Sequence, residues 1–228
     1  MADALAAAIE YLHCASLVHD DLPCFDNAAM RRGRRSVHAA YGEAAAVLVG
    51  DGLIVLAFQT LADVAEDAGS RLGLLLRIVS DSVGIPAGLV TGQAMESEAA
   101  PVMRTYHAAK TGALFEAATA GGAAAAGADT DLWRGVGTRI GAVYQIADDI
   151  YDHIGTESLG KPAKIDERLG RPNIVAELGF GGAVAAVRSA IEEAEDAIPA
   201  GRDAAALRAF IRAQTARFLP SDLLTSAV

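Results

Sequence analysis

The sequence predicts an all-α protein, and three observations support this fold class. Ala and Leu outnumber the β-branched and aromatic residues, and aromatic residues make up only 5% of the 228-residue chain, a balance that favours helices over strands. Apolar residues recur at helical spacings of three and four, as at Leu72, Leu75, Leu76 and Val79. No segment has the alternation of a strand ladder. Because no repeat or linker divides the chain, we expect a single domain over residues 1–228.

The individual helices follow from this periodicity and from the residues at their ends. Pro86 and Pro101 suit the first turn of a helix, and Asp129 or Thr130 can cap one. A polar stretch with Gly and Pro, Gly155–Pro172, separates the last helices from the rest. The predicted helices are Ala2–His19, Ser36–Glu66 (one helix or two), Ser70–Val83, Pro86–Glu98, Pro101–Ala126, Asp129 or Thr130 to Ile154, Val184–Ala197 and Asp203–Phe218.

Composition excludes several classes of function. With 19 Lys and Arg against 29 Asp and Glu, the formal charge is −10, so the chain is a poor partner for nucleic acid or an anionic membrane. The longest apolar run, Val47–Ala62, contains Asp51 and Gln59, and we expect a core helix there and no membrane span. The N-terminus has no basic region of a secretory signal. Cys14 and Cys24 indicate reduced thiols in a cytoplasmic protein.

A cluster of carboxylates in the sixth predicted helix is a first functional signal. Around an ideal helix Asp148 and Asp152 lie about 40° apart, Asp149 lies about 60° from Asp152, and Tyr144 and Gln145 share their face. A solvated acidic face is the alternative interpretation. The apolar residues between these positions instead predict a largely buried helix, where carboxylates repel one another unless a cation pairs with them. Clustered carboxylates suit Mg²⁺, which also takes oxygens from substrate phosphates.

Another acidic run ends the first predicted helix, in the segment HDDLPCFD (residues 19–26). In an unbroken helix Asp26 would lie on a different face from Asp20. Because Pro23 disfavours a continuous helix, we expect the chain to leave the helix after Asp21 and to bring Asp26 back beside Asp20. Such a loop would complete a metal site; a polar helix end is the alternative.

Basic residues are sparse, and several follow the acidic runs. No Lys or Arg precedes Arg31, and then Arg31, Arg32, Arg34 and Arg35 come together. Guanidinium groups bind phosphate oxygens in pairs and stay charged; a solvated basic turn is the alternative. The lysines are Lys110, which Thr111 follows, Lys161 and Lys164. Two acidic runs with these cations form a pattern suited to a metal–diphosphate complex.

In their order and spacing these motifs resemble those of the trans-isoprenyl diphosphate synthases. The resemblance runs from about Ala7 to Gly179 through LHCASLVHDDLPCFDNAAMRRG, YGEAAAVLVGD, GLVTGQ, KTGALF, YQIADDIYD and GK…D…GRPN. The form of the first motif is most similar to bacterial geranylgeranyl diphosphate synthases of carotenoid and photosynthetic pigment pathways. The resemblance implies an all-α isoprenoid-synthase bundle around a deep cavity, usually a homodimer.

The activity that the resemblance implies is a prenyl transfer dependent on Mg²⁺, with Mn²⁺ as an alternative ion. Isopentenyl diphosphate would be condensed with an allylic diphosphate (farnesyl, geranyl or dimethylallyl) to give geranylgeranyl diphosphate. Six aspartates would hold the metal on the allylic diphosphate: Asp20, Asp21, Asp26, Asp148, Asp149 and Asp152. The substrate-binding residues would be Arg31, Arg32, Lys110, Thr111, Tyr144, Gln145, Lys161 and Arg171, with Arg32 facing isopentenyl diphosphate. The groups expected to act directly in catalysis are Asp20, Asp21, Asp26, Lys110, Asp148 and Lys161.

The resemblance also gives an expectation for product length. In this family the helix before the first acidic run forms a wall of the cavity, and a bulky residue four or five positions before its first aspartate shortens the product. Here those positions are Ser16 and Ala15, both small, with Leu12 one turn deeper. We therefore expect room for a C20 chain.

The sequence departs from the family pattern before Asp20. Only 19 residues precede it and none is Lys or Arg, so the Gly-Lys-Arg segment that binds isopentenyl diphosphate in the family is missing. We expect a fragment or a misplaced start of an active synthase. The alternatives are a short form that binds an allylic diphosphate without condensing it, and a subunit that modulates a partner synthase. Farnesyl diphosphate synthase and terpene cyclase are the rival enzymes; the acidic motif at residues 148–152 favours chain elongation over cyclisation.

Overall fold

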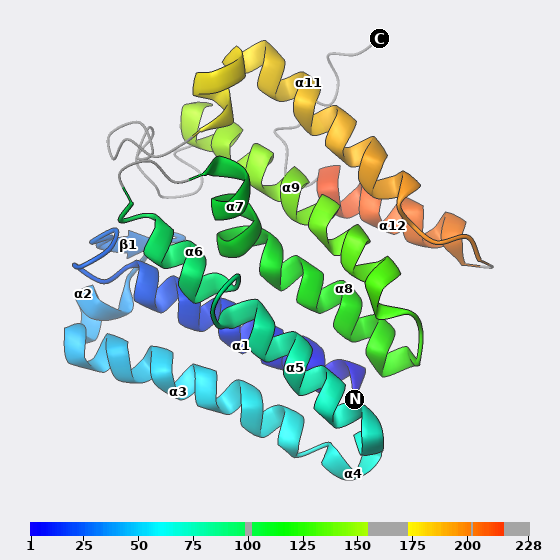
Figure 1. The fold of residues 1–228 in the computed structure, drawn as a ribbon. Helices are drawn as coiled ribbons and strands as arrows, with labels where there is room; N and C mark the ends of the chain where they lie inside the picture. The colour runs from blue at the N-terminus through cyan, green and yellow to red at the C-terminus, as the bar shows by residue number, and fades with distance from the viewer. Residues whose placement is uncertain (99–101, 155–172, 202, 217–228) are drawn as a thin grey trace.

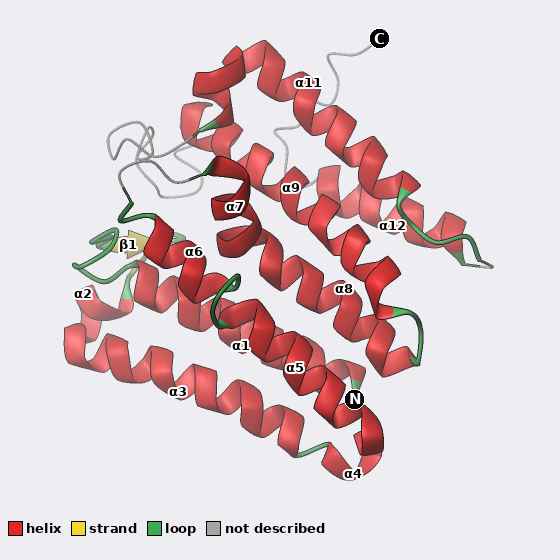
Figure 2. Ribbon diagram, in the orientation of Figure 1, coloured by secondary structure: helices red, strands yellow, loops and turns green. Residues whose placement is uncertain are grey.

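A computed structural model of the chain describes residues 1–98, 102–154, 173–201 and 203–216. Helices dominate these residues (Figure 2), which confirms the predicted all-α class. In chain order the elements are α1 (Ala2–Asp20), β1 (Met30–Arg31), β2 (Arg34–Arg35), α2 (Val37–Tyr41), α3 (Glu43–Ala62), α4 (Ala65–Ala68), the 3₁₀ turn η1 (Gly69–Arg71), α5 (Leu72–Val83), α6 (Leu89–Met95), α7 (Met103–His107), the π-helical turn η2 (Ala108–Gly112), α8 (Ala113–Ala126), α9 (Thr130–Ile154), α11 (Ile174–Asp196) and α12 (Ala204–Ala216).

The long helices pack side by side. As Figure 1 shows, α1 lies against α3 and α8, α8 lies against α9, and α9 lies against α11. In the described residues three groups of buried side chains hold this arrangement together, the smallest of which joins α9 to α12. The first, here called the α1 core, joins α1, α3, α5 and α8 through residues such as Leu12, Leu61 and Leu75. On the other side of α8, α9 packs on α11 through Val143, Ile150 and Val187, among others, and we call this group the α9 core.

The α1 helix is buried along one face because its apolar residues recur every three or four positions. Leu5, Ala8, Leu12 and Ala15 are all buried, as expected for an amphipathic core helix. The close contact with α8 depends on Gly121, where a Cβ would lie 2.6 Å from a methyl carbon of Leu5. Small residues thus let α1 lie deep in the bundle, with its C-terminal end carrying Asp20.

Several element boundaries differ from the sequence prediction. The helix expected from Pro86 begins at Leu89 instead, because Gly88 has an extended backbone (φ −90°, ψ −171°). The helix expected from Val184 begins at Ile174, where Asn173 caps it by accepting a hydrogen bond from the Val175 N–H at 2.8 Å. The helix expected from Pro101 is interrupted by the π turn. The segment Gly155–Pro172, Pro101 and Phe218 lie outside the described residues.

One small sheet was not expected from the sequence. Residues Met30–Arg31 and Arg34–Arg35 form an antiparallel hairpin of two-residue strands. Its turn places Arg32 (φ 50°) and Gly33 (φ 75°) in the left-handed region, as in the turns that best fit tight hairpins. Strands this short carry no readable alternation. The hairpin directs Arg31 back toward the end of α1.

The outer face of α3 is apolar and exposed. Leu48 is 70% exposed, and Val47, Val49, Val55 and Leu56 on the same helix are also exposed. By length and hydropathy both α3 and α11 would suffice to cross a membrane, although no such role follows from composition alone. The absence of a membrane span therefore stays a prediction, and the exposed apolar residues mark the outer face of α3 as a candidate contact surface.

Candidate active site

The two acidic runs lie at the same end of the molecule. The C-terminal ends of α1, α6 and α9 all point toward the side on which the β1 hairpin lies (Figure 1). α1 delivers Asp20 and Asp21, and α9 delivers Asp148, Asp149 and Asp152. The π turn that joins α7 to α8 contacts both α6 and α9, so it lies between the two runs.

The loop after α1 folds back as Pro23 predicts. The Asp26 N–H donates to the backbone oxygen of Asp20 at 3.0 Å, which returns Asp26 to the end of the helix. Carboxylate oxygens of Asp20, Asp26 and Glu96 all lie within 4.8 Å of one another. We call these three residues the carboxylate cluster. Three carboxylates this close repel one another unless cations balance them.

Among the described residues, two cations reach the carboxylate cluster. Lys110 forms an ion pair with Glu96 and lies 3.5 Å from Asp20 (Nζ to Oδ1). Arg31 lies 3.3 Å from Asp20 (Nη2 to Oδ2). Gln93 donates from its amide nitrogen to Asp20 at 3.2 Å and to Glu96 at 2.8 Å. The cluster is therefore a charged centre whose acidic groups are oriented by neighbouring donors.

Asp21 differs from Asp20 because it is buried and binds Arg31 through both of its carboxylate oxygens. It is only 3% exposed, and the Arg31 Nε donates to both of its carboxylate oxygens at 2.8 and 2.9 Å. Burial alone lowers the pKa of Arg31, but the hydrogen bond and charge of Asp21, with the charges of Asp20 and Asp26, outweigh burial and raise it. Asp21 thus fixes a permanently charged guanidinium beside the carboxylate cluster.

Gln93, Glu96 and Tyr106 were not among the residues predicted for the site. Tyr106 donates from its hydroxyl to Glu96 at 2.8 Å, so all three belong to one hydrogen-bonded group. A signal was available for two of them, because Gln93 and Glu96 are three residues apart and share a helix face. Nothing in the local sequence would have brought Tyr106 to Glu96.

The π turn presents Lys110 and Thr111 to different partners. Lys110 faces the carboxylate cluster, whereas the Thr111 hydroxyl donates to the Gln145 side-chain oxygen at 2.6 Å. The turn packs closely on α6, since a Cβ at Gly92 would lie 2.4 Å from the Lys110 backbone nitrogen. Such π-helical turns occur frequently at functional sites. Here the turn links the surroundings of the two acidic runs.

In the second acidic run, Asp148 and Asp149 have opposite environments. Asp148 is exposed, whereas Asp149 is 1% exposed. Asp149 accepts hydrogen bonds from the Gln145 amide and from the Ile174 backbone N–H, both at 2.8 Å. Its two oxygens thus hold Gln145 and the start of α11. The predicted metal-binding role of Asp149 stays a prediction beside this observed one.

Tyr144 lies within electrostatic reach of the second acidic run and of the basic hairpin. Burial raises its pKa, and so does the negative charge of Asp148, while the charges of Arg32 and Arg31 lower it. Its ring packs against Phe115 with centroids 5.4 Å apart. A neutral phenol is therefore held between the second acidic run and the basic hairpin.

The remaining predicted residues fall into three groups. Of the residues expected to limit chain length, Leu12 and Ala15 are buried in α1, whereas Ser16 is half-buried and its hydroxyl donates to the His13 backbone oxygen at 2.8 Å. Arg32 is exposed in the hairpin turn and Asp152 is partly exposed. Lys161 and Arg171 lie outside the described residues.

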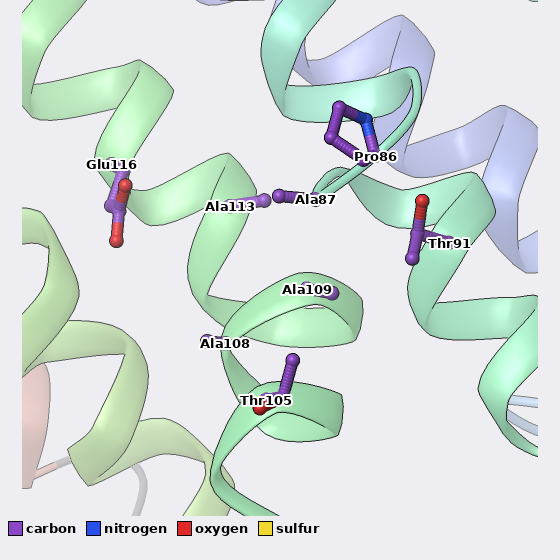
Figure 3. Close-up of a pocket in the computed structure, with 8 residues that line it drawn as sticks. All are labelled: Pro86, Ala87, Thr91, Thr105, Ala108, Ala109, Ala113 and Glu116. Atoms are coloured by element: carbon purple, nitrogen blue, oxygen red, sulfur yellow. The ribbon is translucent and has the colours of Figure 1, made fainter. Parts of the chain in front are cut away.

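A pocket of about 170 Å³ lies elsewhere, between α6 and the α7–α8 segment. Figure 3 shows its small side chains, with Thr91 and Glu116 on opposite sides. The lining residues are Pro86, Ala87, Thr91, Thr105, Ala108, Ala109, Ala113 and Glu116. None of the predicted site residues is among them, so this pocket is distinct from the acidic end of the bundle.

Known proteins are similar to this chain in sequence and in fold. The family model described as Polyprenyl synthetase matches residues 1–197. A geranylgeranyl diphosphate synthase of Cereibacter sphaeroides is 45% identical over 224 residues, which cover 98% of this chain and 78% of the relative. A geranylgeranyl diphosphate synthase of Rhodobacter capsulatus is 47% identical over 198 residues, which cover 86% of this chain and 68% of the relative.

A comparison with solved structures also finds a prenyltransferase of similar fold. The geranyltransferase of Helicobacter pylori, in complex with magnesium and isoprenyl diphosphate, superimposes with a TM-score of 0.80 at 30% sequence identity. The match covers 94% of this chain and 73% of that one. The isoprenoid-synthase bundle expected from the sequence is therefore the fold observed.

Proposed function

This chain belongs to the polyprenyl synthetase family, and from that membership we propose that it condenses isopentenyl diphosphate with an allylic diphosphate to give geranylgeranyl diphosphate. The observation that carries the proposal is the carboxylate cluster of Asp20, Asp26 and Glu96, paired with Lys110 and lying at the same end of the bundle as the acidic run of α9. Relatives at 45% and 47% identity are named for this product.

The residues present fit Mg²⁺ as the cofactor, with Mn²⁺ as the alternative ion. Asp20, Asp26 and Glu96 can each offer one oxygen to the same small volume, and hard oxygen ligands are those that Mg²⁺ prefers. In the second run Asp148 and Asp152 would supply carboxylates, while Asp149 orients Gln145. When bound, the ions supply positive charge to the diphosphate leaving group.

The side chains of the site match the charge changes of the reaction. As the allylic C–O bond breaks, its electron pair leaves with the diphosphate, and Lys110 and Arg31 bring positive charge to that region. The double bond of isopentenyl diphosphate then attacks the allylic cation, and the new intermediate loses a proton to the departing diphosphate. Thr111 and Gln145, which hydrogen bond to each other, are positioned to orient the diphosphate. The apolar wall of α1 would keep water from the cation.

The assay that tests the proposal uses radiolabelled isopentenyl diphosphate with Mg²⁺ and either dimethylallyl, geranyl or farnesyl diphosphate. Elongation to a C20 product supports the proposal, and accumulation of a C15 product would identify a farnesyl diphosphate synthase. A cyclic hydrocarbon formed from the allylic substrate alone would identify a terpene cyclase. Absence of turnover, with allylic diphosphate still bound, would favour a subunit that binds substrate or a partner synthase.

Product length should respond to Ala15. Because Ala15 is buried in α1 five residues before Asp20, an aromatic ring in its place would shorten the space for the growing chain. We expect Ala15→Phe to shift the main product from geranylgeranyl to farnesyl diphosphate, as measured by chromatography of the dephosphorylated products. Ala6→Phe, at an exposed position of the same helix, is the matched control and should keep the C20 product. Unchanged C20 output from Ala15→Phe would refute the assignment of this wall.

A second copy of the chain is the proposed cover for the outer face of α3. The exposed residues Val47, Leu48, Val55 and Leu56 form an apolar surface along one helix, with the exposed carboxylate of Asp51 among them, and such a surface can form the core of a homodimer interface. We expect a dimer by light scattering, and Leu48→Glu should shift the mass toward the monomer because it would bury an unpaired charge. Glu66→Gln, at an exposed position beyond α3, should leave the dimer unchanged. A wild-type monomer at micromolar concentration would contradict this interface.

The same proposal extends to location and pathway. Cys14 and Cys24 are both free thiols, which supports a reducing cytoplasmic location. A C20 diphosphate is a precursor of carotenoids and photosynthetic pigments, and these are the pathways that the sequence resemblance implies.

A further inference from the structure

The residue before Asp20 is held in a slot on α3. A Cβ placed on Gly50 would lie 2.0 Å from His19 Nε2, 2.4 Å from Cδ2 and 2.6 Å from Cε1. The imidazole therefore occupies the space that any other residue at position 50 would fill. Gly50 is buried in the middle of α3, so this contact is part of the packing between α1 and α3.

Polar contacts hold the ring in the slot. His19 Nε2 lies 3.4 Å from the backbone oxygen of Val47, one helical turn before Gly50. The same nitrogen lies 3.8 Å from the exposed carboxylate of Asp51. The ring is thus fixed to α3 by its shape and by its polar edge, and His19 is joined directly to Asp20 through the backbone.

The contact between His19 and Gly50 affects the position of Asp20 in the carboxylate cluster. Asp20 is the last residue of α1, where a helix is free to fray, yet its carboxylate must meet Asp26 and Glu96 from different segments. Because His19 immediately precedes Asp20, its contact with α3 would fix the last turn of α1. Glycine in a helix interior is less favourable than alanine, so α3 retains at position 50 a residue that its own helix does not favour.

We propose that His19 and Gly50 are positioning residues that seat the last turn of α1 on α3 and thereby place Asp20 for metal binding. This inference rests on the proposed function, since it assigns the Asp20 cluster to the metal. Gly50→Ala would push the imidazole out of its slot and move Asp20 away from its partners. Supporting residues around metal ligands typically contribute 10- to 100-fold to affinity.

The test measures binding of Mn²⁺ in the presence of inorganic diphosphate, followed by the electron paramagnetic resonance signal of the free ion. We expect Gly50→Ala to weaken Mn²⁺ binding by about tenfold, with thermal unfolding recorded in parallel. Gly52→Ala is the matched control, because a Cβ at this helical position of α3 meets nothing within 4 Å. It should leave Mn²⁺ affinity unchanged.

A double-mutant cycle separates positioning from general damage to α3. Once His19→Ala has removed the ring, the added methyl group has nothing to displace, so Gly50→Ala should cost little further affinity in that background. Equal losses with and without the imidazole would overturn the proposal, as would no loss in Gly50→Ala alone. Should Gly50→Ala fail to fold, His19→Ala decides the matter: weaker Mn²⁺ binding supports the proposal and unchanged binding refutes it.

The wild-type assay keeps this inference separate from the proposed function. If wild-type protein elongates no prenyl chain, the function fails while the Mn²⁺ comparison still decides whether His19 and Gly50 position Asp20. If wild-type protein turns over and Gly50→Ala binds Mn²⁺ normally, only the positioning role is lost.

Discussion

Asp20→Asn should lower kcat by about 10²- to 10³-fold, the range seen when one group that stabilises developing charge is removed. Asp20 is the member of the carboxylate cluster that contacts both Lys110 and Arg31. It also accepts a hydrogen bond from Gln93. Asparagine keeps the shape of the side chain but removes its charge. The variant should therefore fold as the wild type does while binding Mn²⁺ more weakly.

The measurement is kcat at saturating and at limiting Mg²⁺, with Mn²⁺ affinity determined separately. Glu98→Gln is the control, because it removes one charge from an exposed residue two positions beyond Glu96 without touching the cluster. Wild-type kcat in Asp20→Asn at both metal concentrations would show that this end of α1 is not where the metal acts.

Asp149→Ala should lower the free energy of unfolding by about 2–4 kcal/mol, as expected when buried hydrogen-bond donors lose their acceptor. Asp149 is buried, and its two oxygens accept from the Ile174 backbone N–H and from Gln145. The alanine variant would leave the first turn of α11 without its side-chain acceptor. Gln145 would lose its anchor, and with it the contact to Thr111 would loosen.

Urea denaturation followed by circular dichroism measures this loss. Asp149→Asn retains an oxygen for the Ile174 N–H and should lose less stability than the alanine variant. Asp196→Ala, at the exposed C-terminal end of α11, should change stability by no more than about 0.5 kcal/mol. If Asp149→Ala had the same free energy of unfolding as the wild type, the hydrogen bonds of Asp149 would contribute nothing to stability.

The sequence predicted the fold class and the principal helices because their signals are local. Apolar periodicity located α1 and α9, and Asp129 caps α9 as expected by accepting from the Asp131 and Leu132 N–H groups. The start of α11 was placed ten residues late because Gly179 (φ 72°) interrupts its pattern. A π turn and a two-residue hairpin leave no periodic signal at all.

The acidic site was only partly predictable for a related reason. Pro23 was enough to predict that Asp26 returns to Asp20, because a chain break after a helix is a local event. The association of Glu96 with Tyr106, and of Asp149 with the start of α11, arises from contacts between elements that are far apart in sequence. Spacing within one helix also could not reveal that Asp149 turns inward while Asp148 is exposed.

The division of the bundle into an α1 core and an α9 core has a consequence for how substrate affects the whole molecule. One acidic run belongs to each core, and the α8–α9 packing and the contacts of the π turn join the two cores. A diphosphate gripped from both sides would act as a removable cross-link. Its arrival should raise the unfolding temperature by an amount set by ligand concentration.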